Sequence, residues 1–257
     1  MITFNSFNLQ DSNFITERVE FKGLADRDVI RARVNRREGI SLLNTEYSEK
    51  TIVLSGVVIA SSGSELQGLL DDLKKNIQQE EADLVLEDGR TWTATNTSLS
   101  IPDEHYSQSM ARFEAEFLCT NPYAVGSLLT AVKPVISGVF TYSGMVNISG
   151  TYFARPTITY TPAGAANGRT NIKNLVLYHV PTGQSMTVSG FGSGVSLNYS
   201  DVVIINMDSF TALEGASSID SDGAFMRWEP GDNDYTITVS GRHVGGSVTV
   251  AYQPRYI

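Results

Sequence analysis

The distribution of apolar positions along the chain predicts one helix among strands. After Ser61, apolar side chains recur at the spacing of a single helical face, and charged side chains cover the opposite face. Ser62 and Glu65 have the spacing of a capping box, with Ser64 and Gln67 as a second pair. We therefore expect a helix over about 64–79. The apolar stripe consists of Leu66, Leu69, Leu70, Leu73 and Ile77.

The segments on either side of this helix have the pattern of strands. "KTIVLSGVVIA" before it is a β-branched run that contains Gly56, and "ADLVLEDGRTWTA" after it has two runs joined by Asp88-Gly89. That dipeptide is typical of a two-residue type I′ hairpin. In "SMARFEAEFLCT" apolar and polar residues alternate, with Phe113 and Phe117 on the apolar side. The pattern predicts a small β-sheet or split barrel with one helix across an apolar face.

The composition of the chain changes at "TNPYAVGSLL", after which charged residues become sparse. We therefore expect one domain over 1–127 and a second over 128–257. The second part consists of short apolar runs separated by Gly, Pro, Asn and Asp, which is typical of an antiparallel β-sandwich. The predicted fold class is therefore mainly β. The predicted strands include "RPTITYTP", "NLVLYHV", "QSMTVSG", "DVVIINM", "DYTITVSG" and "SVTVAYQP".

Composition narrows the classes of function. The chain has 257 residues, of which 41% are hydrophobic and 18% charged, enough for a sizeable core. The net charge of −9 disfavours direct nucleic-acid binding, because an acidic surface repels phosphate. A single cysteine allows no internal disulfide. No signal peptide or apolar membrane span is evident, so we expect a soluble protein made in the cytoplasm and no membrane insertion.

No catalytic or metal-binding pattern occurs in the sequence. The histidines His105, His179 and His243 are isolated from one another and from Cys119, which lies on the apolar side of its strand. We interpret them as structural residues. A hydrolase would need a nucleophile–base pair or metal-ligand spacing, and neither is present. We therefore expect no enzyme activity, no cofactor and no metal site.

Two short motifs resemble ligand-binding loops. "FGSGVS" at 191–196 is rich in glycine, but it lacks the Gly-Lys-Ser/Thr ending of a phosphate loop and is interpreted as a turn. "DSDG" at 220–223 resembles the start of a calcium loop without its later ligands. We interpret it as a β-turn, with a calcium site as the alternative.

Two groups of residues are candidates for recognition. The segment "RDVIRARVNRREG" carries Arg31, Arg33, Arg36 and Arg37. It is either a solvated strand or hairpin rim, or a protein interface with neighbouring copies of the chain, since arginine is enriched in interfaces. The aromatic residues of the second part are either core or platforms for sugar rings. They are Trp228, Tyr178, Tyr199 and Tyr235.

The order of elements over about residues 50–125 resembles that of the distal tail (Dit) proteins of long-tailed, non-contractile bacteriophages. The resemblance rests on "VLSGVVIASSGSELQGLLDDLKKNI", "LVLEDGRTWTA" and "ARFEAEFLCTNPYA". In the second half, Pro181-Thr182-Gly183, "SDVVIINMD", "EPGDN" and the final "YQPRYI" match the family less closely. Ser200 stands where the family commonly has Gly, so the geometry of that turn departs from the family pattern.

This resemblance implies a structural role in the virion. The first domain would form a ring, usually a hexamer, at the end of the tail tube. The second would be a galectin-like β-sandwich that docks tip, baseplate hub or receptor-binding proteins. The sugar-binding motifs of galectins are absent from this sequence: there is no His-Asn-x-Arg strand, and Trp228 is followed directly by Glu229 where galectins have Trp-Gly-x-Glu. A carbohydrate-binding module that contacts the host surface, with Trp228 as sugar platform, is the alternative hypothesis.

Overall fold

The computed structural model of the chain describes residues 1–21, 27–32, 41–102, 107–136, 140–162, 171–189, 202–242 and 245–257. For 27–32, 41–46, 171–172 and 241–242 it describes the backbone alone. The chain divides into two compact units, residues 1–126 with Ile257 and residues 127–256. The division lies between 126 and 127, next to the expected boundary between 127 and 128. The fold is mainly β with one helix among the described elements, as the sequence predicts.

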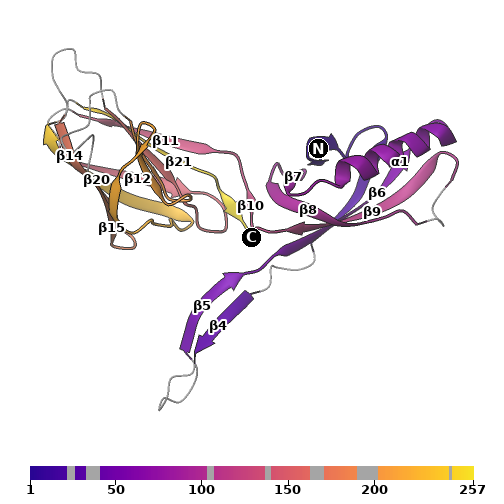
Figure 1. Cartoon of the computed structure of the whole chain (residues 1–257), viewed down its shortest axis with the longest axis horizontal. Helices are drawn as coiled ribbons and strands as arrows, with labels where there is room; N and C mark the ends of the chain where they lie inside the picture. Colours follow the sequence, from indigo (N-terminus) through magenta and orange to yellow (C-terminus); the bar gives the residue numbers. More distant parts are fainter. Residues whose placement is uncertain are drawn as a thin grey trace. The chain divides into compact units, whose positions relative to one another are not determined.

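An antiparallel sheet that closes on itself forms the first unit (Figure 1). Its strands follow the order β2-β1-β7-β8-β9-β6-β3, and β10 pairs with β8. A bridge between Gln10 and Ile15 links the segment after β2 to β3, so the two ends of this path meet in a split barrel. The strands are β1 (Thr3–Phe4), β2 (Phe7–Asn8), β3 (Phe14–Phe21), β6 (Lys50–Ile59), β7 (Ala82–Val85), β8 (Thr91–Ser100), β9 (Met110–Cys119) and β10 (Ala124–Val125).

The predicted helix is α1 (Gly63–Ile77), which packs against β6. Ser62 is its N-cap, and the Ser62 hydroxyl accepts a hydrogen bond from the Glu65 backbone N–H at 3.3 Å. The Glu65 carboxylate accepts from the Ser61 backbone N–H at 2.7 Å, one residue earlier than in a standard capping box. Four residues of the predicted stripe are buried, and each contributes about 1.5–3 kcal/mol. They are Leu66, Leu70, Leu73 and Ile77.

The interior of the barrel explains the alternation of β9 and the glycine in β6. Alternate residues of β9 from Ala111 to Cys119 are buried, as predicted. The Phe117 ring packs on Phe4 with centroids 4.8 Å apart. Gly56 pairs with Phe113, and a Cβ at position 56 would lie 2.4 Å from the Ile15 carbonyl oxygen and 2.8 Å from the Phe113 ring. The glycine is therefore required by close packing.

The hairpin at Asp88-Gly89 differs from the prediction. Gly89 has a φ of 75°, but Asp88 is not among the residues with positive φ, so the prediction of a two-residue type I′ turn is wrong. The Gly89 N–H donates to Leu86 O, and the Leu86 N–H donates to Arg90 O. This geometry is a type I turn followed by a left-handed glycine. A two-residue turn with two positive φ values occurs instead at Asn5-Ser6, between β1 and β2.

A second strand pair lies between β3 and β6 in the sequence, β4 (Arg27–Ala32) and β5 (Ser41–Tyr47). Among the described strands, β4 and β5 pair only with each other (Figure 1). Residues 27–47 are called the arm below. An isolated two-stranded ribbon is marginally stable in water, and the outer edges of this one pair with no other described strand.

Two antiparallel sheets form the second unit, with the core between them. One has the order β11-β21-β13-β16-β17-β18, and the other β12-β20-β14-β15-β19. The first comprises β11 (Leu129–Val135), β13 (Thr157–Pro162), β16 (Val203–Asn206), β17 (Thr211–Glu214), β18 (Ser217–Ser218) and β21 (Gly246–Tyr252). The second comprises β12 (Thr141–Ile148), β14 (Asn171–His179), β15 (Gln184–Ser189), β19 (Asp220–Gly223) and β20 (Gly231–Arg242). The short β22 (Arg255–Tyr256) follows.

The antiparallel β-sandwich and all six strands expected for it are confirmed. A galectin-like connectivity within it stays a prediction. One expectation is wrong: residues 220–223 form strand β19, which pairs with β15, and are not a β-turn. The strands β11 and β12 were not predicted, because β11 contains Pro134 and the core-facing side of β12 contains Gly144.

Candidate functional site

The arm holds the arginine-rich segment that the sequence singled out. The backbone of Arg31 lies in β4, next to a shift in its register with β5. Arg33, Arg36 and Arg37 lie outside the described residues. Over 27–47 the sequence has five arginines against Asp28, Glu38 and Glu46, so the arm is net positive in a chain of net charge −9. The net positive charge of this segment, in an acidic chain, favours contact with acidic partners.

Trp228 does not provide the sugar platform considered above. Its side chain is 0% exposed, in the core of the second unit. One neighbouring ring is His179, stacked at 5.2 Å and 6°, and another is Tyr235 at 5.5 Å and 27°. A sugar platform must expose a ring face, so the structure does not support Trp228 in this role. Tyr178 is 40% exposed, and Tyr199 lies outside the described residues.

His179 is a structural residue that joins two turns. Asn233 donates its amide hydrogens to the carbonyls of Glu229 and Gly231, both at 2.8 Å. Its Oδ1 therefore accepts from His179 Nε2 at 3.0 Å, and His179 Nδ1 accepts from the Thr182 hydroxyl at 2.8 Å. Burial lowers the pKa of His179, opposed by the Asn233 hydrogen bond. The neutral imidazole thus fastens the "PTG" turn to the "PGDN" turn.

Lys50 is a buried cation in the barrel. It is 7% exposed, and its Nζ lies 4.8 Å from the Trp92 ring centre and 5.1 Å from that of Phe21. Burial lowers the pKa of Lys50, and it raises that of the cross-strand partner Cys119 to about 12. Cys119 is 0% exposed and is a structural thiol, as predicted.

A cluster of arginines and phenylalanines on the second unit was not predicted. The guanidinium carbons of Arg155, Arg227 and Arg255 lie 5.8, 5.2 and 5.9 Å from the Phe153 ring centre. Arg155 also lies 4.6 Å from the ring of Phe210, which is 54% exposed. These five residues are called the arginine–aromatic patch below. They come from distant parts of the sequence, so no local motif signals the patch.

The charges of the patch are only partly compensated. Arg255 pairs with Asp208 at 2.7 Å and Arg227 with Glu229 at 3.4 Å. Among the described residues Arg155 has no carboxylate within ion-pair distance, and its guanidinium group lies over the two phenylalanine rings. Arginine and aromatic residues dominate protein interfaces, because the planar cation binds carboxylates and also stacks on rings. The patch therefore has the chemistry of a docking surface for an acidic partner.

The remaining candidates do not form a chemical site in the described structure. His105, His243 and the 191–196 loop lie outside the described residues. Within the described part of the chain, no group of three or more His, Cys, Asp or Glu side chains is placed to hold a metal ion. The calcium alternative at 220–223 therefore has no support. None of the helices described is long and apolar enough to cross a membrane.

Comparison with solved structures finds the same fold in a phage protein. The crystal structure of the SPP1 Dit protein, described as a hub of the adsorption apparatus in phages that infect Gram-positive bacteria, aligns with a TM-score of 0.73. The alignment covers 100% of this chain and 98% of that chain at 12% identity. The chain therefore has the Dit fold over its whole length. At this identity, the likeness concerns the fold.

Two further alignments are weaker. The phage P2 baseplate in its activated, calcium-containing conformation aligns at a TM-score of 0.41 and 10% identity, over 91% of this chain and 90% of that chain. A fructofuranosidase from Schwanniomyces occidentalis aligns at 0.26 and 7% identity, over 90% of this chain and 59% of that one. Neither carries an argument. No family model and no curated protein sequence matches the chain.

Proposed function

We propose that this protein is a structural component of the distal end of a phage tail, where it forms a ring that joins the tail tube to tip, baseplate and receptor-binding proteins. The observation that carries the proposal is the alignment of both units, end to end, with the SPP1 Dit hub protein. The role is architectural rather than enzymatic, and its place is the tail tip of the virion.

In this proposal the first unit makes the ring, by analogy a hexamer. A cyclic ring needs two different patches on each copy, because each copy contacts its neighbours through opposite sides. The arm is one of these patches, since β4 and β5 pair with no other described strand and the sequence over 27–47 is net positive. The acidic surface of the neighbouring copy or of the tail tube supplies the complementary charge.

The second unit docks the peripheral proteins through the arginine–aromatic patch. An acidic partner surface would place a carboxylate on Arg155 and pack apolar atoms on Phe210. Exposed ion pairs at the rim of an interface contribute little to affinity. The contacts of the guanidinium groups with the phenylalanine side chains therefore supply much of the orientation of the bound partner.

Electron microscopy of negatively stained protein, together with native mass measurement, tests the ring. We expect closed rings of the full chain, alone or on added tail tube protein. In a matched variant, a short Gly-Ser loop replaces residues 27–47. Phe21 still pairs with Ile52, so the barrel should fold while rings are lost. A protein that stays monomeric at high concentration and does not bind tail tube protein would contradict the proposal.

A charge-reversal variant tests the patch separately. Arg155→Glu should leave ring formation unchanged and reduce incorporation of the peripheral proteins into tail tips assembled in the infected host. Lys173→Glu, at an exposed position of β14, is the control with the same charge change. Equal incorporation in both variants would remove the patch from the docking surface without affecting the ring.

A further inference from the structure

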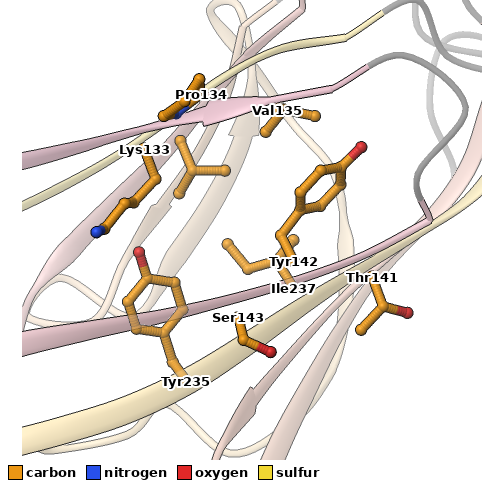
Figure 2. A pocket seen from close by; sticks show the side chains of 9 residues that line it. Lys133, Pro134, Val135, Thr141, Tyr142, Ser143, Tyr235 and Ile237 are labelled. Carbon is orange, nitrogen blue, oxygen red and sulfur yellow. The ribbon is translucent and has the colours of Figure 1, made fainter.

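A cavity of about 330 Å³ lies between the two sheets of the second unit, at the side where β11 and β12 form the sheet edges (Figure 2). This volume corresponds to roughly ten molecules of liquid water, so a single bound water would not fill it. It lies at the lower end of the range for small-molecule pockets. The lining residues are Lys133, Pro134, Val135, Thr141, Tyr142, Ser143, Tyr235, Ile237 and Val248.

Tyr235 brings a buried hydroxyl without a partner to this cavity. The residue is 2% exposed, and its Oη has no hydrogen-bond partner among the residues that the structure describes. The other two tyrosine hydroxyls nearby differ: Tyr142 Oη donates to Ile136 O at 2.6 Å, and Tyr160 Oη donates to Gly245 O at 3.4 Å. A buried hydroxyl is costly to leave unpaired, so its position on a cavity wall indicates a partner from outside the chain.

Gly144 makes room for this tyrosine. It pairs directly with Tyr235 across β12 and β20, at a core-facing position between Tyr142 and Val146. A Cβ at position 144 would lie 2.5 Å from Cζ and Oη of Tyr235. Any side chain larger than hydrogen would therefore displace the hydroxyl from its place on the cavity wall.

Lys133 gives the cavity its charge. It is the sole charged residue among the nine that line the cavity. It lies in β11 opposite Val248, on the same side of the strand as the buried Val135. The ammonium group and the Tyr235 hydroxyl are both donors, whereas Pro134, Val135, Ile237 and Val248 provide apolar walls.

We propose that this cavity binds a small monocarboxylate with an apolar body. The carboxylate accepts a hydrogen bond from Tyr235 Oη and pairs with the Lys133 ammonium group, and the apolar body packs between the sheets. A charged acceptor fits better than a neutral one, because hydrogen bonds to ionised groups are the stronger kind. This inference concerns the sandwich alone and does not depend on the tail-tip proposal.

Calorimetric titration of the full chain with hexanoate, hexanamide and hexan-1-ol tests the proposal. We expect saturable binding of hexanoate in the millimolar range or tighter, and about tenfold weaker binding of hexan-1-ol. Tyr235→Phe should weaken hexanoate about tenfold, and Lys133→Gln should abolish the preference for hexanoate over hexanamide. Tyr178→Phe and Lys173→Gln, at positions outside the cavity, should bind as the wild type does.

Tyr235→Phe removes a hydroxyl that has no hydrogen-bond partner in the described part of the chain, so this variant should fold with an unchanged or higher melting temperature. A loss of binding is then a loss of the contact. The proposal is overturned if hexanoate shows no saturable binding at millimolar concentration, as expected for a cavity that holds only water. It is equally overturned if Tyr235→Phe binds hexanoate as tightly as the wild type does. It is also overturned if Lys133→Gln keeps the preference for hexanoate over hexanamide, as expected if Lys133 serves only to protect the sheet edge.

Discussion

Replacing glycine by alanine should have opposite effects at two positions of the first unit. At Gly56 the new methyl group would lie 2.4 Å from Ile15 O and 2.8 Å from the Phe113 ring, and both are held by the barrel. Overpacking of this kind costs about 1–3 kcal/mol. At Gly68, in α1, nothing lies within 4 Å of the added Cβ. Alanine there should stabilise the helix by about 1 kcal/mol.

The first unit holds residues 1–126, and for a unit of this size 1 kcal/mol shifts the melting temperature by roughly 4 °C. We therefore expect Gly56→Ala to lower the melting temperature of this unit by about 4–12 °C and Gly68→Ala to raise it by about 4 °C. Calorimetry measures the shifts, and hydrogen exchange with mass spectrometry assigns them to peptides of each unit. Shifts of the same sign in the two variants would refute the packing argument.

Three further predictions concern single side chains. The folded-state pKa of His179 is lowered, so the unfolded chain takes up a proton at a higher pH than the folded chain does. The stability of the second unit should therefore fall as the pH drops through about 6.5, the unperturbed pKa of histidine. Urea unfolding between about pH 8 and 5.5 should show a smaller loss of stability in His179→Gln than in the wild type. Cys119, with its pKa raised to about 12, should react with a thiol reagent only in denaturant, and fast labelling of native protein would contradict its burial. Ser62→Ala should destabilise the first unit by about 1 kcal/mol through loss of the N-cap, and an unchanged urea midpoint would show that Ser61 and Glu65 suffice to cap the helix.

Features set by local spacing were predictable. The stripe from Leu66 to Ile77 and the alternation around Phe113 each arise from neighbours in the sequence, so helix α1 and strand β9 follow from periodicity. The turn type at Asp88-Gly89 was not predictable from the dipeptide. The same two residues also suit a type I turn with a left-handed glycine, and the choice depends on how Leu86 and Arg90 pair.

Features set by the meeting of distant segments were not predictable. The arginine–aromatic patch combines the side chains of residues 153 and 155 with those of 210, 227 and 255. The cavity combines Lys133 of β11, Tyr142 of β12 and Tyr235 of β20. Gly144, which pairs with Tyr235, also obscured the alternation of β12. The sequence left Trp228 open between core and sugar platform for the same reason, because the rings that cover it come from β14 and β20.

The separate cores have a practical consequence for spectroscopy. The chain has two tryptophans, Trp92 in the first unit and Trp228 in the second, and they are 4% and 0% exposed. Each unit thus contains one buried tryptophan, whose fluorescence reports on that unit alone. A variant that keeps one indole turns intrinsic fluorescence into a readout of a single unit, so folding and assembly can be followed in either half without an added dye.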